Sequence, residues 1–168
     1  MNIVLTGFMA TGKSAVGKIL SQRLRRPFFD TDDMIEKQTG VSIPQIFSGA
    51  GEAAFREMET QTIGLVALMP AAVIATGGGA PLRPANMAEL EKNGRVFCLT
   101  AEPETILERL RSEPATRPLL QGEEPLRRIK ELLNERAAAY ARCAHRVPTD
   151  GKTPAQVAED ILTLFPAS

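Results

Sequence analysis

One stretch near the amino terminus carries the residue types needed to hold a phosphate group. Residues 7–14 read GFMATGKS, the spacing G-x-x-x-x-G-K-S, between the apolar run at 3–5 and an expected helix. Glycines in such a loop allow dihedrals that turn successive N–H groups into one anion-binding concavity. Lys13 would reach the β- and γ-phosphates, and the Ser14 hydroxyl would hold Mg²⁺. The spacing and its context favour a phosphate-binding loop (P-loop) over an accidental glycine turn.

Two aspartates supply candidate groups for phosphoryl transfer. Asp30 and Asp32 follow a short apolar run at 27–29. The reaction needs a carboxylate that supports the metal and a group that orients the attacking hydroxyl. We expect an extended segment here, in which residues two apart point the same way, towards one phosphate. Helix capping by either residue is the competing interpretation, and Asp33 is assigned to capping or solvent.

A glycine run and two arginines are harder to interpret locally. Gly77, Gly78 and Gly79 follow a buried strand, and glycines allow a backbone to approach a ligand closely. Arg56 and Arg136 lie in helical patterns. Most helical arginines are solvated or paired with a carboxylate one turn away, so local sequence alone favours that interpretation for both.

The segment 112–125 predicts a long loop, because its proline and glycine content excludes a regular helix or strand. Long loops within a domain often act as lids. This one carries Arg117, which closure would bring to the transferring phosphoryl group. We expect the lid to be mobile without ligand and to close when nucleotide and substrate are both bound.

These groups must be positioned by a parallel sheet, because apolar runs alternate with helical patterns. The expected strands are 2–6, 27–29, 72–76, 95–100 and 144–147. The expected helices are 13–24, one ending at 37, 43–69 with a break near 48–51, 84–92, 102–110, 124–141 and 154–165. In open α/β sheets, ligands bind beyond the carboxyl ends of the strands, where the P-loop, the aspartates and the glycine run all fall.

Composition narrows the class of protein. A chain of 168 residues predicts one domain with a real core. The formal net charge of zero gives no broad basic field for nucleic acid or membrane. Cys98 and Cys143 have no metal-binding spacing and are expected as free thiols, with one disulfide as the alternative. We expect a cytoplasmic monomer that binds small molecules, without signal peptide or membrane span.

Several motifs in one order resemble the shikimate kinases, a family of small P-loop kinases. They are residues 7–14, 29–32 (FDTD), 51–59 (GEAAFREME), 76–79 (TGGG), 117–120 (RPLL), and Glu135-Arg136 with Tyr140. The P-loop alone identifies a superfamily, whereas the DxD, the glycine run and RPLL together are much more specific. The resemblance implies ATP-dependent phosphorylation of the 3-hydroxyl of shikimate, giving shikimate 3-phosphate and ADP, a step of aromatic amino acid (chorismate) biosynthesis.

The same resemblance implies an α/β fold of the three-layer P-loop kinase type. Its five-stranded parallel sheet is flanked by helices, and the single domain covers 1–168. A substrate-binding helical segment is expected near 31–60 and a lid near 112–125.

The resemblance also implies roles for individual residues. Asp32 binds a substrate hydroxyl and is placed as the base, with Lys13 and Arg117 as the other catalytic residues. Mg²⁺ is the expected cofactor, coordinated by Ser14 and supported by Asp30. The shikimate-binding residues are expected to be Asp32, Arg56, Gly77, Gly78, Gly79 and Arg136, of which the arginines hold the carboxylate. The expected nucleotide-binding residues are Ala10, Thr11, Gly12, Lys13, Ser14, Ala15, Arg109, Arg117 and Lys152.

Two positions depart from the family pattern. Ala10 stands where the family usually has glycine. Alanine fits if that position keeps a negative φ, so we expect the loop to survive with altered nucleotide affinity. Both Arg109 and Arg111 approximate the adenine-contacting arginine, and Arg109 is preferred because its Arg-Leu pair matches better.

Other functions use part of the same pattern. A gluconate kinase or a nucleotide monophosphate kinase shares the P-loop but does not account for the aspartates, the glycine run and RPLL together. A GTPase switch lacks support, because no guanine-reading N-K-x-D segment is present. A catalytically dead relative would be expected to lose Lys13 or Asp32, and both are present.

Overall fold

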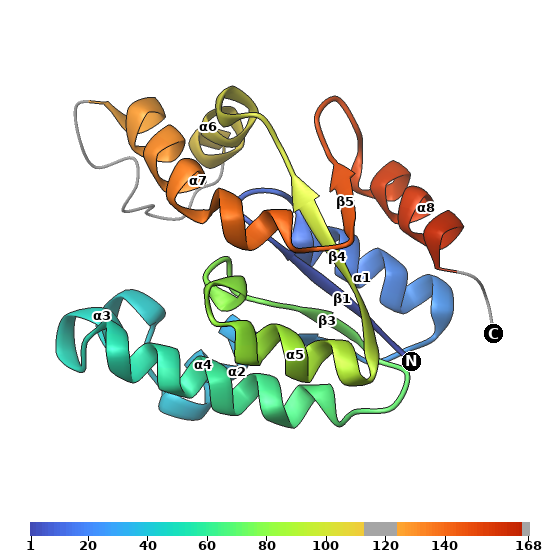
Figure 1. The fold of residues 1–168 in the computed structure, drawn as a ribbon, viewed down its shortest axis with the longest axis horizontal. Coiled ribbons are helices and arrows are strands. Elements are labelled where there is room, and N and C mark those ends of the chain that lie inside the picture. The colour runs from blue at the N-terminus through green and yellow to red at the C-terminus, as the bar shows by residue number, and fades with distance from the viewer. Residues whose placement is uncertain (113–123, 166–168) are drawn as a thin grey trace.

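A parallel sheet with strand order β2-β3-β1-β4-β5 forms the centre of the computed structural model, which describes residues 1–112 and 124–165 (Figure 1). This confirms the predicted five-stranded α/β architecture. The strands are β1 (Asn2–Gly7), β2 (Phe28–Asp30), β3 (Val73–Ala75), β4 (Gly94–Thr100) and β5 (His145–Pro148).

Helices connect and cover the strands. They are α1 (Lys13–Leu24), α2 (Thr31–Thr39), α3 (Ile43–Gly49), α4 (Glu52–Ala67), α5 (Pro84–Lys92), α6 (Pro103–Ser112), α7 (Pro125–Ala141) and α8 (Pro154–Leu164). The predicted break between α3 and α4 is present, and Gly51 occupies it with a φ of 87°. A short 3-10 helix, η1 (Ala80–Leu82), follows the glycine run and was not predicted. Among the described residues, 1–112 and 124–165, none of the helices has the length and hydrophobicity of a membrane span.

The core lies on both faces of the sheet, and β1 shows why. Its Val4 side chain packs in one cluster with Ile63 of α4 and Leu90 of α5. The alternating Ile3 and Leu5 belong to a second cluster, whose helical members come from α1 and α8. Because helices cover both faces, every residue of β1 is buried. The centre of the sheet is therefore a rigid platform for the loop that follows β1.

A third apolar cluster lies beyond the sheet. Ile35 of α2, Ile46 of α3 and Phe55 of α4 pack together there. In Figure 1, α3 projects beyond the sheet, whereas α4 runs back beside α5, and its Ile63 packs against the sheet. The cluster holds α4, which carries Arg56, beside the carboxyl edge of the sheet.

The strand register brings the predicted functional segments to one edge. Ala75 pairs with Leu5 on one side and with Asp30 on the other, so β1, β2 and β3 reach their carboxyl ends side by side. Gly7 ends β1 with a φ of 132°, and a Cβ there would collide with the Leu99 carbonyl of β4. A glycine is therefore required where the P-loop leaves the sheet.

Candidate active site

The P-loop curls around its own lysine. Lys13 begins α1, and its Nζ donates to the carbonyl oxygens of Gly7 and Phe8, at 2.9 Å each. Thr11 Oγ1 closes the loop with a bond of 2.7 Å to the same Phe8 carbonyl. Burial lowers the pKa of Lys13 to about 8, and the Asp32 and Asp30 carboxylates oppose that change. The lysine is thus a desolvated amine at the predicted phosphate position, facing carboxylates.

Ala10 does not have the negative φ that was the condition for alanine to fit here. Its φ is 58°, in the left-handed region that alanine adopts only at a cost of about 1–2 kcal/mol. The chain reverses direction in this loop, and Gly12 follows with a φ of 91°. Arg109 Nη1 donates to the Ala10 carbonyl at 3.1 Å. A side chain of another element therefore fixes the strained peptide.

Asp30 caps a helix and also contacts the P-loop serine. Its Oδ1 accepts from the Asp32 backbone N–H at 3.1 Å, which caps α2. Its Oδ2 accepts from Ser14 Oγ at 2.6 Å. The capping interpretation and the functional one are therefore compatible. A hydroxyl and a carboxylate oxygen, both hard ligands, form a donor set suited to Mg²⁺.

Asp32 lies in the first turn of α2, so the expected extended geometry at this residue was wrong. The helix starts directly after β2 because Asp30 supplies the cap. Burial, followed by repulsion from Asp30 and Glu59, raises the pKa of Asp32 to about 7, and Lys13 opposes the rise. Asp32 Oδ1 is buried without a hydrogen-bond partner. A carboxylate with a free oxygen and a near-neutral pKa is suited to accept a proton from a bound hydroxyl.

The glycine run lets functional side chains close around the backbone. A Cβ on Gly77 would lie 2.7 Å from Asp32 Oδ1 and 2.8 Å from Glu59 Oε1. A Cβ on Gly79 would collide with the Arg56 guanidinium, and one on Gly78 would lie 3.5 Å from Arg136 Nη1. Gly77 therefore makes room for two carboxylates and Gly79 for the Arg56 guanidinium, while Arg136 lies beside Gly78 at an ordinary contact distance.

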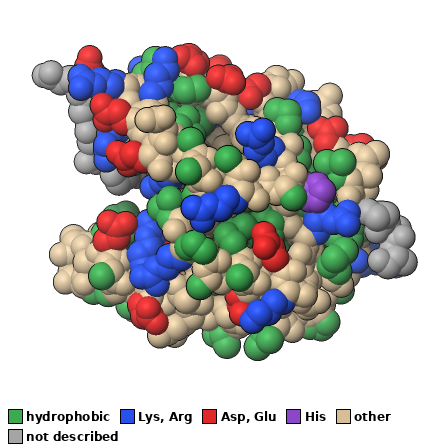
Figure 2. Space-filling model, in the orientation of Figure 1, with side chains coloured by type: hydrophobic (Ala, Val, Ile, Leu, Met, Phe, Trp, Pro, Cys, Tyr) green, Lys and Arg blue, Asp and Glu red, His purple; other side chains and the backbone are tan. Residues whose placement is uncertain are grey.

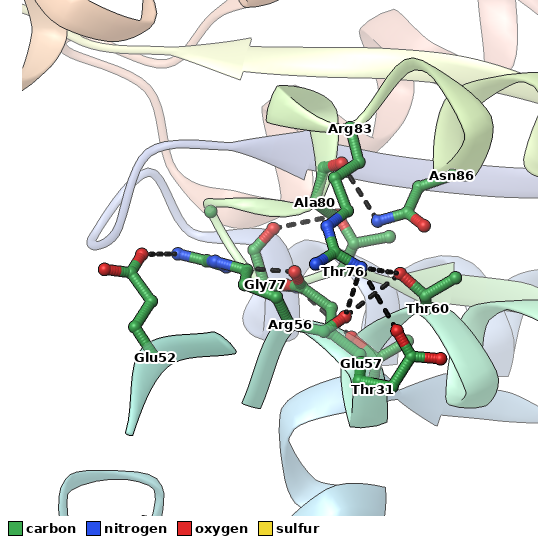
Figure 3. Close-up of polar contacts among 12 residues, drawn as sticks. Thr31, Glu52, Arg56, Glu57, Thr60, Thr76, Gly77, Ala80, Arg83 and Asn86 are labelled. Atoms are coloured by element: carbon green, nitrogen blue, oxygen red, sulfur yellow. Dashed lines mark hydrogen bonds and ion pairs between the residues drawn. The ribbon is translucent and has the colours of Figure 1, made fainter. Parts of the chain in front are cut away.

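Arg56 is held by acidic residues on its own helix. Nη2 pairs with Glu52 Oε1 at 3.3 Å, as Figure 3 shows. Nη1 bonds to Glu59 Oε2 at 2.9 Å. Glu59 is fully buried, and burial raises its pKa while Arg56 opposes the rise. Glu59 was not predicted as a site residue. Its spacing of three residues from Arg56 was the available signal.

Arg83, the residue before α5, is hydrogen-bonded to α4. Arg83 Nη1 donates to the Arg56 carbonyl at 3.1 Å and to Thr60 Oγ1 at 3.0 Å, as Figure 3 shows. On the other side of the glycine run, Thr31 Oγ1 accepts from the Gly77 N–H at 3.2 Å. Thr31 therefore fixes Gly77 relative to α2, and Arg83 fixes the segment after the glycine run relative to α4.

Arg136 lies on α7 and extends its guanidinium group to the glycine run. Its guanidinium carbon lies 5.4 Å from the centre of the Phe8 ring, beside the P-loop. Figure 2 shows basic side chains around the hollow that separates α7 from α3 and α4. Local sequence offered two interpretations of Arg56, and the structure shows the second: the side chain is 14% exposed and pairs with carboxylates one turn away.

A cavity of about 230 Å³ lies on the other side of the P-loop. Arg109 borders it and is fixed by bonds to Thr149 Oγ1 at 2.9 Å and the Thr149 carbonyl at 2.8 Å. Arg111 is exposed and does not line this cavity. The predicted nucleotide residues that line the cavity are Ala10, Thr11, Gly12, Arg109 and Lys152.

Ala15 is exposed on α1 and does not line this cavity. Five lining residues were not predicted as nucleotide-binding: Val16, Ser112, Thr149, Pro154 and Val157. Thr149 follows the last strand, and that position was the available signal. Arg117 and most of the predicted lid lie outside the described residues.

Comparison with known proteins agrees with this geometry. The family model for shikimate kinase matches residues 9–165. A shikimate kinase of Thermodesulfovibrio yellowstonii is 48% identical over 161 residues, which cover 96% of this chain and 92% of that protein. The structure of the Acinetobacter baumannii shikimate kinase in complex with shikimate has a TM-score of 0.88 at 37% identity, covering 98% of this chain and 92% of the other.

The Bacteroides thetaiotaomicron shikimate kinase has a TM-score of 0.90 at 32% identity and covers 98% of both chains. Identities of 32–48% over nearly the whole chain exceed what the P-loop shared with gluconate and nucleotide monophosphate kinases would give. The chain therefore belongs to the shikimate kinase family, whose members are ATP-dependent kinases.

Proposed function

We propose that this protein transfers the γ-phosphoryl group of ATP to the 3-hydroxyl of shikimate. One observation carries the proposal: Arg56 and Arg136 approach adjacent glycines from different helices, beside Asp32. Two guanidinium groups bind a planar carboxylate with directional, charge-assisted hydrogen bonds. Shikimate offers one carboxylate and hydroxyl groups on the same ring, so one molecule can contact both arginines and Asp32.

The proposed roles follow from the positions of the side chains. Asp32 accepts the proton of the attacking hydroxyl through its unpaired oxygen. Lys13 moves from the loop carbonyls to the phosphates and stabilises their charge. The cavity beside Arg109 receives the adenine, against the apolar side chains of Val16 and Val157. The two substrates thus enter from opposite sides of the P-loop.

Mg²⁺ would be held by Ser14, with Asp30 in support. When bound, it supplies charge neutralisation at the β- and γ-phosphates. Residues 1–112 and 124–165 contain no cluster of three or more His, Cys, Asp or Glu side chains fit for a metal. That suits an ion whose remaining ligands are phosphates and water.

Some expectations stay predictions. They are a phosphate-contacting role for Arg117 on a closing lid, a single domain, a monomer, a cytoplasmic location, and the lack of nucleic-acid or membrane partners.

A coupled ATP-consumption assay with and without shikimate tests the function. ATP should be consumed rapidly only when shikimate is present, and the product should be shikimate 3-phosphate. Gluconate and nucleoside monophosphates, offered as other acceptors, should give no comparable rate. Faster turnover of either acceptor than of shikimate would refute the proposal.

A further inference from the structure

The chain has one tyrosine, and its hydroxyl contacts the glycine run. Tyr140 lies near the end of α7 with 8% of its surface exposed. Its hydroxyl donates to the Gly78 carbonyl oxygen at 2.8 Å. The bond joins the backbone at the predicted substrate position to a helix that is distant in sequence.

The same helix presents Arg136 one turn earlier, on the same face as Tyr140. Arg136 Nη1 would lie 3.5 Å from a Cβ on Gly78, so both side chains meet this glycine. Burial raises the pKa of Tyr140 to about 12, and the neighbouring Arg136 charge opposes that rise. The hydroxyl therefore stays neutral and able to donate around neutral pH.

A glycine run needs such a restraint if it is to contact a ligand reproducibly. Without side chains, residues 77–79 have wide conformational freedom. Gly77 is fixed by Thr31 through its N–H, and Gly79 lies against Arg56. Gly78 is fixed through its carbonyl oxygen by the Tyr140 hydroxyl. Tyr140 lies on α7, the helix that also carries Arg136.

We propose that Tyr140 is a positioning residue for shikimate: its hydroxyl sets the Gly78 backbone and Arg136 at one fixed separation. The inference rests on the proposed function. Substrate contacts must be made within a few tenths of an ångström. A loosened Gly78 therefore weakens shikimate binding more than it slows phosphoryl transfer to bound shikimate. The nucleotide cavity lies across the P-loop and does not depend on this bond.

The Tyr140→Phe variant removes only the hydroxyl. Its KM and Kd for shikimate should rise roughly fivefold, the fold-change for loss of one neutral hydrogen bond. Its KM for ATP should change little, and kcat should fall less than the shikimate KM rises. Ser21→Ala is the matched control, because it removes a 2.6 Å side-chain bond to the Arg26 carbonyl at the far end of α1. That variant should keep both KM values.

A merely structural tyrosine would give a different result. Equal loss of ATP and shikimate affinity in Tyr140→Phe, or unchanged shikimate affinity, overturns the inference. Wild-type protein that neither binds nor phosphorylates shikimate instead refutes the proposed function itself.

Spectroscopy gives a test that needs no variant. The chain contains one tyrosine and no tryptophan, so Tyr140 is the only tyrosine or tryptophan that absorbs in the near ultraviolet. Shikimate without nucleotide should shift the Tyr140 spectrum, and ADP without shikimate should shift it much less. If shikimate binds by calorimetry and the Tyr140 spectrum does not respond, the inference is wrong even where Tyr140→Phe fails to fold.

Discussion

Ser14 Oγ donates to Asp30 Oδ2 at 2.6 Å, and this bond joins the first turn of α1 to the end of β2. The other Asp30 oxygen caps α2, whose first turn carries Asp32. One carboxylate therefore aligns the P-loop with the proposed base. Both oxygens of Asp30 are hydrogen-bonded, whereas Asp32 Oδ1 has no hydrogen-bond partner. Substitutions of the two aspartates should therefore have different effects.

Asp32→Asn should lower kcat roughly a hundredfold or more, because the proposed base loses its ability to accept a proton. Asp30→Asn should instead raise the Mg²⁺ concentration needed for half-maximal rate, since the amide binds Mg²⁺ more weakly than the carboxylate. A Mg²⁺ titration of both variants checks the division of roles. Matching titration curves would argue against it.

Lys13→Ala should abolish turnover while the protein stays folded. The Lys13 amine bonds to loop carbonyls and packs no apolar core, so its loss removes phosphate contacts first. Circular dichroism and the ATP-consumption assay measure the two effects. Lys18→Ala, an exposed lysine on the same helix, should keep full activity. A folded Lys13→Ala protein with normal turnover would exclude the proposed phosphate contact.

Replacing Arg56 or Arg136 by alanine should weaken shikimate binding by about 1.5–3 kcal/mol or more, the range for hydrogen bonds to charged groups. ATP affinity should change little, because the nucleotide cavity has other lining residues. Calorimetry with each ligand measures both affinities. Arg127→Ala is the control on α7, since that side chain is 70% exposed. Equal loss for both ligands would indicate a role in folding.

Ala10→Gly should stabilise the protein slightly, by up to about 1 kcal/mol, because glycine accepts the φ of 58° without strain. Ala138→Gly, at an exposed position within α7, should cost about 1 kcal/mol. Urea unfolding of both variants gives the comparison. Equal destabilisation would mean that Ala10 is not strained.

The pH dependence of stability should reveal the buried Asp32. Its pKa rises from 3.8 to about 7 on folding, so the folded state binds this proton more tightly than the unfolded state. Stability from this group is therefore complete below pH 3.8 and is lost as the pH rises through about 7. Asp32→Asn, neutral at every pH, should be more stable than the wild type above pH 7, by up to about 4 kcal/mol.

That advantage should shrink as the pH falls towards 3.8. Thermal unfolding of both proteins across this range, without nucleotide or metal, measures it. A constant or growing advantage at low pH would contradict the assigned burial effect. The expected result would identify the proposed base as a site where function costs stability.

The sequence by itself determined the order of the elements and the edge of the sheet at which chemistry occurs. Hydrophobic periodicity and glycine spacing are local properties, so α1 and α5 begin and end at the predicted residues. The order of strands and helices placed the P-loop, Asp30 and the glycine run at the carboxyl edge, because parallel strands point the same way.

Only the tertiary structure decided which side chains meet at that edge. Arg56 and Arg136 lie far apart in the chain, and the packing of α4 and α7 brings them to adjacent glycines. The same packing gives Glu59 its burial and Tyr140 its bond to Gly78. The positive φ of Ala10 depends on loop closure. A local pattern does not specify which helix faces converge, because that convergence is a long-range property of the packed chain.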